Sequence, residues 1–133
     1  MHDALPKTTG KGKGILAMNQ DNTWIDRKCA ELMGWYEDRL LDFHNNLYWI
    51  DPRGDRPMYQ IGDWHPSTNP THCKQVTDKL IEQGWNFSVY YWHIENIWVA
   101  IFAMPPHLTE YRQYDKTEWR ARCLASLATK EKS

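Results

Sequence analysis

Residues 66–104 read PSTNPTHCKQVTDKLIEQGWNFSVYYWHIENIWVAIFAM and contain a helix start, a helix and two strands in one run. Asn69 suits the N-cap, and Pro70 suits the first helical position because proline needs no N–H there. Thr68 is the alternative cap, with a slightly earlier start. The apolar spacing that follows predicts a helix over residues 70–83.

Two strands follow this helix. Residues 85–92 alternate between two faces, and residues 97–104 are apolar on both faces. The four-residue connection, 93–96, favours an antiparallel hairpin. A strand that is apolar on both faces is expected at the centre of a sheet, with both faces covered.

The rest of the chain supplies weaker signals. Helices are predicted over residues 23–33, where Asn22 or Thr23 is the expected cap, and 117–130. Residues 47–50 indicate a short strand, residues 58–59 a possible second extended piece, and residues 105–114 a loop. The resulting fold class is α+β: a small antiparallel sheet packed with three helices, similar to an α/β/α sandwich.

Residues 1–20 have the composition of a flexible N-terminal tail, with three glycines, three lysines and no helical stripe. Ile15, Leu16 and Met18 in this tail could dock loosely onto the core. Residues 21–133 are then expected to form a single domain.

Composition excludes several classes of protein. The formal charge is −1, which argues against a dedicated nucleic-acid-binding protein, and no apolar run is long enough to span a membrane. No secretory signal is visible at the start of the chain. The three cysteines fit no CxxC pattern and are expected to be reduced, buried thiols, which suggests a cytoplasmic setting.

The sequence predicts no catalytic residue, no metal and no cofactor. It holds no phosphate loop, no nucleophile elbow and no histidine pair at metal-binding spacing. The nearest grouping, His65, His72 and Cys73, is better explained by surface or capping histidines beside a buried thiol.

The start of the second helix is the first candidate binding site. Polar side chains there meet unsatisfied N–H groups and the positive end of a helix dipole, a combination that can hold a phosphate or a nucleotide. Ordinary helix capping explains the same residues. The candidate ligand-binding residues are Trp64, His65, Ser67, Thr68, Asn69, Arg53 and Lys74.

The aromatic side chains of the hairpin are the second candidate. If no helix covers Tyr90, Trp92, Trp98 and Phe102, they would form a surface for a partner or for self-association. If a helix covers them, they belong to the core.

Four motifs together resemble the phage ABA sandwich domain family. They are CAELMGW at residues 29–35, WHPSTNP at 64–70, VTDKLIEQGW at 76–85 and ARCLASL at 121–127. The resemblance covers about residues 23–129. It implies a small bacteriophage or prophage protein with helices packed on a sheet, for which the expected cytoplasmic setting is the host cytoplasm, and it brings no assigned reaction.

Three functions are therefore considered. The first is a non-enzymatic phage binding protein that inhibits host antiviral defence, either by sequestering a nucleotide signal or by blocking a host protein. The second is a small enzyme acting on a nucleotide or phosphorylated substrate. The third is a homo-oligomeric structural or assembly accessory protein of the phage.

Overall fold

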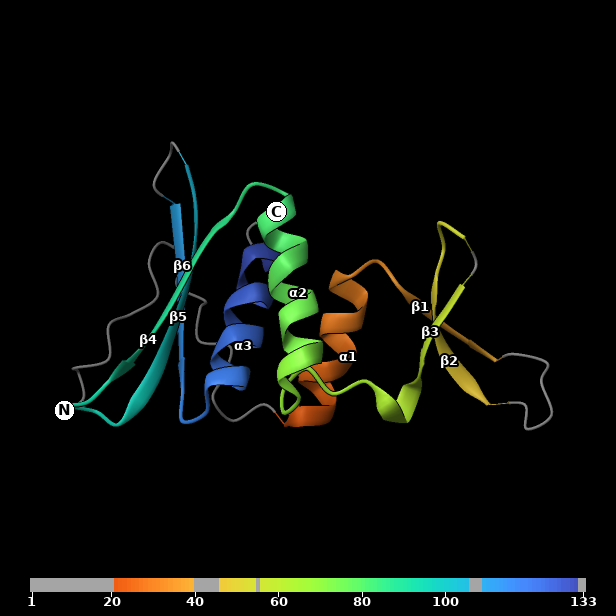
Figure 1. Ribbon diagram of the computed structural model, residues 1–133, viewed down its shortest axis with the longest axis horizontal. Helices are drawn as coiled ribbons and strands as arrows, with labels where there is room; N and C mark the ends of the chain where they lie inside the picture. Colours follow the sequence, from red (N-terminus) through yellow and green to blue (C-terminus); the bar gives the residue numbers. More distant parts are fainter. Residues whose placement is uncertain (1–20, 40–45, 55, 106–108, 132–133) are drawn as a thin grey trace.

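The structure, a computed structural model, describes residues 21–39, 46–54, 56–105 and 109–131. The predicted tail, residues 1–20, lies outside these ranges. The described chain forms three layers, with helices between two sheets (Figure 1). The helices are α1 (Asn22–Leu32), α2 (Pro70–Glu82) and α3 (Glu118–Glu131), and a short 3-10 helix, η2, spans Ile61–Asp63.

Each sheet has three antiparallel strands among the described residues. The first has the order β1-β2-β3, with β1 at Tyr36–Arg39, β2 at Leu47–Asp51 and β3 at Arg56–Gln60. The second has the order β4-β5-β6, with β4 at Asn86–Trp92, β5 at Ile97–Met104 and β6 at Thr109–Asp115. The α+β class and the antiparallel hairpin are confirmed, and a second sheet adds a layer that the sequence did not indicate.

The starts of α1 and α2 are each marked by a capping side chain. Asn69 caps α2 as predicted, and Pro70 is its first residue. The cap of α1 is Asp21, whose side chain accepts a hydrogen bond from the Trp24 backbone N–H, so the expected cap at Asn22 or Thr23 is wrong by one or two residues. Within the described ranges, none of the helices has the length and apolar character of a membrane span.

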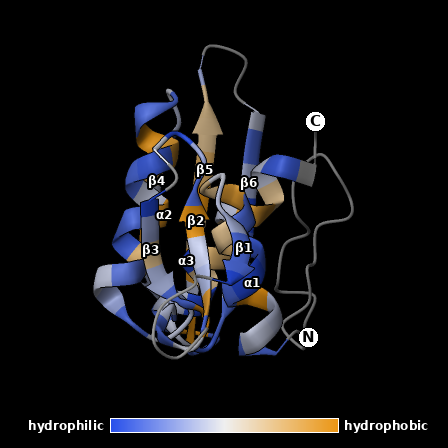
Figure 2. Ribbon diagram, turned by 90° about the vertical axis from the view of Figure 1, so that its right-hand side faces the viewer, coloured by the Kyte–Doolittle hydropathy of each residue, from blue (hydrophilic) through white to orange (hydrophobic). Residues whose placement is uncertain are grey.

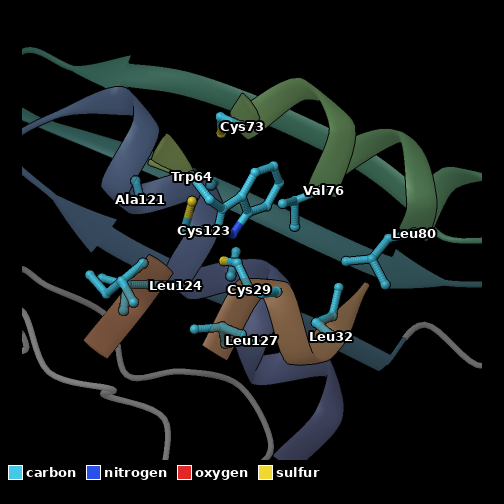
Figure 3. Close-up of a cluster of buried hydrophobic side chains, with 14 of the residues drawn as sticks. Cys29, Leu32, Trp64, Cys73, Val76, Leu80, Ala121, Cys123, Leu124 and Leu127 are labelled. Atoms are coloured by element: carbon cyan, nitrogen blue, oxygen red, sulfur yellow. The ribbon is translucent and has the colours of Figure 1, made fainter. Parts of the chain in front are cut away.

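The main core lies around α3, where the three helices meet (Figure 3). Leu124 of α3 is fully buried, and so is Phe102, which β5 contributes from the sheet. The three cysteines, one from each helix, are free thiols and are buried, as predicted. They act here as small apolar side chains: Cys29, Cys73 and Cys123.

Residues 105–114 were predicted as a loop, which is wrong for the part that the structure describes. Thr109–Asp115 form β6, which pairs along β5 so that Tyr111 lies opposite Phe102. Its apolar signal is weak because polar Gln113 and Asp115 occupy the buried side of the strand. β1, which no pattern indicated, is exposed and hydrophilic, whereas β5 is hydrophobic along most of its length (Figure 2).

The four aromatic residues of the hairpin do not form one surface. In the observed register, Tyr90 lies opposite Val99, and Tyr91 lies opposite Trp98. Side chains directly opposite each other share a face, so Trp98 and Phe102 point toward the helices while Tyr90 points away. Phe102 is completely buried and belongs to the core, and Trp92 lies on the same face as Tyr90.

Candidate binding site at the second helix start

The turn before α2 is fastened to α1 through one acidic residue. Asp26 is 8% exposed, and its Oδ1 accepts a hydrogen bond of 2.9 Å from the backbone N–H of Ser67. Its backbone carbonyl accepts another, also of 2.9 Å, from the Trp64 indole. Its Oδ2 lies 3.4 Å from Nδ1 of His65. Asp26 therefore fixes both the path of the turn and the position of its histidine.

The donors at the start of α2 are already engaged. Oδ1 of Asn69 accepts from the N–H groups of Thr71 and His72 at 2.9 and 3.2 Å. Cys73 donates to the carbonyl of Asn69 at 2.9 Å, and Pro70 has no N–H. A phosphate would thus have to displace the cap before it met a backbone donor of this helix.

His72 is part of the support for the turn. Its Nδ1 accepts a hydrogen bond of 3.0 Å from the His65 backbone N–H, and its ring stacks on Trp64 with centroids 5.2 Å apart. Burial, together with the nearby His65, lowers the pKa of His72. The neutral ring is the form that accepts this hydrogen bond.

Four aromatic rings connect the β1-β2-β3 sheet to the helices. Trp35 and Tyr59 come from the sheet side, and each contacts Trp64, with ring centroids 4.8 and 5.1 Å apart. His72 of α2 completes this aromatic bridge at 4.7 Å from Tyr59. Trp64 is only 1% exposed, so its ring offers no free face on which a ligand could stack.

A small pocket lies on the α1 side of the aromatic bridge and is called here the Asp26 pocket. It has a volume of about 170 Å³. Arg27 lies 5.6 Å from the ring centroid of Trp49 in this pocket and also pairs with Glu37. The lining residues are Thr23, Asp26, Arg27, Trp49, Ile61, Gly62, Trp64 and His65.

A wider groove of about 280 Å³ lies on the α2 side and is called here the Arg53 groove. Its lining combines three cations, three carboxylates and an apolar floor. The lining residues are Met33, Trp35, Asp51, Arg53, Arg56, Met58, Gln75, Asp78, Lys79 and Glu82.

Buried Asp51 organises the cations of this groove. It accepts hydrogen bonds from the Arg53 backbone N–H, Nε and Nη2 at 3.0, 3.2 and 3.0 Å, and Nη2 of Arg56 lies 3.8 Å away. The Arg53 side chain lowers the pKa of Asp51, and Asp51 raises the pKa of Arg53. The guanidinium groups are thus held in place while the side chains of Arg53 and Arg56 stay 75% and 67% exposed.

The structure brings together only part of the predicted ligand site. Trp64, His65, Ser67 and Asn69 form one hydrogen-bonded unit, but Trp64 and Ser67 are buried. Thr68 is exposed beside this unit. The two predicted cations are separate from it, because Arg53 lines the other groove and Lys74 pairs with Asp78 at 2.7 Å.

Sequence reasoning missed Asp26, Arg27 and Trp49. A signal for Asp26 existed, since it precedes Cys29 by three residues and Ala30 by four and so shares their helical face. It was counted with the polar face of the helix. No local pattern marked Arg27 or Trp49, which meet only in the folded chain.

The described residues offer little for catalysis. No group of three metal-ligating side chains occurs among them. His65 and Asp26 form a histidine–carboxylate pair, but the neighbouring Ser67 hydroxyl is buried and makes no hydrogen bond. The Cys73 thiol is buried too, and its pKa is raised by a hydrogen bond with Cys123 and by burial, so it is a poor nucleophile.

Comparison with known proteins agrees with this architecture. No curated protein and no solved structure matches the chain. A family model for the phage ABA sandwich domain matches residues 27–127, a range that includes the aromatic bridge, the Arg53 groove and nearly all of the described secondary structure. The chain therefore belongs to the phage ABA sandwich domain family.

Proposed function

We propose that this protein is a non-enzymatic phage binding protein that blocks a host protein of antiviral defence, and that the Arg53 groove is its binding face. The observation that carries the proposal is the pair of exposed arginines, Arg53 and Arg56, gathered around buried Asp51 above Trp35 and Met58. Arginine, tryptophan and methionine are enriched where protein partners bind.

Preorganisation favours this groove as a binding face. Asp51 restricts Arg53 by three hydrogen bonds before any partner arrives. A partner carboxylate that meets this guanidinium group therefore costs less side-chain entropy than one that meets a free arginine.

The charges of the groove suit a polypeptide better than a nucleotide. Asp78 and Glu82 of α2 line it together with Lys79, so a phosphate would face carboxylates as well as cations. A protein segment can place negative side chains against the cations of the groove and positive side chains against its carboxylates. The groove, at about 280 Å³, is also at the lower limit of the volumes that enclose small molecules.

The test compares Arg56→Glu with Lys116→Glu, a matched charge reversal at an exposed position outside the Arg53 groove. Bacteria that carry a defence system would express each variant, and phage plating would report whether the defence is blocked. We expect wild type and Lys116→Glu to restore plating and to retain the same host protein on purification. Arg56→Glu should neither restore phage plating nor retain the host protein, although its circular dichroism spectrum should match that of the wild type. Equal behaviour of the two folded variants would contradict the proposal.

A nucleotide-like ligand in the Asp26 pocket is the second candidate. Two pocket-lining side chains support it, Arg27, which is 43% exposed, and half-exposed His65, because a phosphate could bind both groups. Titration calorimetry with cyclic and linear nucleotides tests it, and the same samples reveal any turnover by a small enzyme. Light scattering tests the third function, a homo-oligomeric assembly protein, which requires more than a monomer at high concentration.

A further inference from the structure

A pocket between α1 and α3 lies apart from the two sites described above and is called here the Trp24 pocket. Its volume is about 340 Å³, compared with about 280 Å³ for the Arg53 groove and about 170 Å³ for the Asp26 pocket. It shares no described lining residue with either of them. The described residues that line it are Trp24, Lys28, Glu31 and Leu32 of α1 and Leu127 and Lys130 of α3.

The two helices run side by side in the same direction, so their last turns meet at this pocket. Nη1 of Arg120, in the first turn of α3, donates to Oδ1 of Asn22, the first residue of α1, at 2.5 Å. Both helices rise from this end in Figure 1. Leu32 is the last residue of α1, and Lys130 belongs to the last turn of α3. A pocket between packed helices is a common place for a small ligand.

The floor of the Trp24 pocket is apolar and well supported. Leu32 and Leu127 are each 7% exposed and belong to the main core (Figure 3). The ring of Trp24 packs against that core and stays partly exposed. Ligand pockets of about 300–1,000 Å³ combine an apolar lining of this kind with a few polar groups. The body of a ligand for this pocket is therefore expected to be a short apolar chain.

The charged groups of the pocket favour an anionic head group on that chain. Nζ of Lys28 lies 3.4 Å from Oε1 of Glu31 and 6.0 Å from the ring centroid of Trp24, and 43% of the Lys28 side chain is exposed. Glu31 is the one carboxylate among the described lining residues, so it cannot neutralise both Lys28 and Lys130. The described lining therefore carries a net positive charge, which attracts an anion and repels a cation.

We propose that the Trp24 pocket binds a small amphipathic carboxylate, of which a short fatty acid is the simplest example, with its chain on the apolar floor and its carboxylate at Lys28 and Lys130. Burial of the chain supplies apolar binding energy. Charge-assisted hydrogen bonds from the ammonium groups hold the head group. This inference does not depend on the function proposed for the Arg53 groove, since the two sites have no described residue in common.

Titration calorimetry with three chains of equal length tests the head group. Octanoate, octanol and octylammonium share an apolar chain and differ in charge. We expect octanoate to bind about threefold more tightly than octanol and octylammonium to bind most weakly. An octanoate affinity no higher than that of octanol or of octylammonium would overturn the proposal, and so would the absence of octanoate binding.

NMR on the full chain tests the place of binding. Titration with octanoate should shift the methyl signals of Leu32 and Leu127 and the indole signal of Trp24. Shifts confined to residues outside the Trp24 pocket would also overturn the proposal.

Three substitutions at exposed positions test the contact with the carboxylate. Lys130→Gln removes one cation of the pocket and should weaken octanoate binding about threefold without changing octanol binding. Glu31→Gln removes the competing carboxylate and should strengthen octanoate binding. Lys116→Gln removes a cation outside the pocket and, as the control, should change neither affinity. An octanoate affinity that either pocket substitution leaves at the wild-type value would contradict the proposal.

Discussion

Asp26 of α1 and Ser67 of the turn before α2, 41 residues apart in the chain, are joined by a hydrogen bond of 2.9 Å from the Ser67 backbone to the Asp26 carboxylate. The same carboxylate lies beside His65. One buried acid therefore determines where the turn lies and where its histidine side chain is held. The turn before α2, which the sequence predicted as a ligand-binding site, therefore has a structural role: it connects α1 and α2.

Replacing this acid should destabilise the fold. Asp26→Ala leaves the buried Ser67 N–H without its acceptor, and we expect a loss of about 1–3 kcal/mol in the free energy of unfolding. Urea unfolding followed by circular dichroism measures it. Asp78→Ala removes an exposed carboxylate and should cost less than about 0.5 kcal/mol. Equal losses in the two variants would show that the hydrogen bond between Asp26 and Ser67 contributes nothing to the free energy of unfolding.

Two substitutions of Asn69 distinguish helix capping from ligand binding. Asn69→Ala removes the acceptor for the Thr71 and His72 N–H groups and should lower stability by about 1 kcal/mol. Asn69→Asp keeps the acceptor and adds a charge that suits a helix N-terminus, so it should retain or raise stability. Thermal unfolding of both variants checks this. An Asp variant as unstable as the Ala variant would rule out capping as its main role.

The elements that sequence reasoning predicted well are those whose signals are local. The Asn69-Pro70 start of α2 rests on a cap and its neighbour, and the alternation in residues 85–92 predicts the strand observed as β4 without help from other segments. β6 carries no such signal. Its buried face includes Gln113 and Asp115, which are polar, so only pairing with β5 identifies it as a strand.

The candidate site was predictable only in part for the same reason. The polar residues of the turn were visible as a helix start, and they do form one unit. Their burial was not visible, because it depends on Asp26 and on the ring of Trp35, both distant in sequence. Composition marked tryptophan as important, but it could not show that Trp64 and Trp49 are both almost fully buried, with 1% and 3% of each exposed.

The observed hairpin register can be tested with two truncations. Phe102→Ala opens a cavity in the main core and should cost about 3–5 kcal/mol. Tyr90→Ala removes a ring on the opposite face that is 45% exposed, and it should cost about 1 kcal/mol or less. Chemical denaturation of both variants gives the comparison. Similar costs would place the two rings in equivalent surroundings and contradict the register.

The buried thiols predict how stability depends on pH in the alkaline range. Burial raises the pKa of Cys123, and a hydrogen bond with Cys123 and burial raise that of Cys73, from an ordinary value of 9.0. Above about pH 9 the unfolded chain loses these protons while the folded chain keeps them. The free energy of unfolding should therefore fall by up to about 1.4 kcal/mol per pH unit for each thiol, and it should not depend on these thiols below pH 8.

Urea unfolding between pH 7 and pH 10 measures this slope, and Cys123→Ala supplies the control. The variant is less stable at every pH because it leaves a small cavity, but its stability should fall less steeply above pH 9. Tyr114, whose pKa is raised to about 12, adds a decline only above about pH 10. Iodoacetamide should leave the native protein unlabelled at pH 8 and label all three cysteines after unfolding, since all three thiols are buried in the native protein. A wild-type slope equal to that of the variant would show that Cys123 ionises in the folded state, and rapid labelling of the native protein would show that a thiol is accessible there.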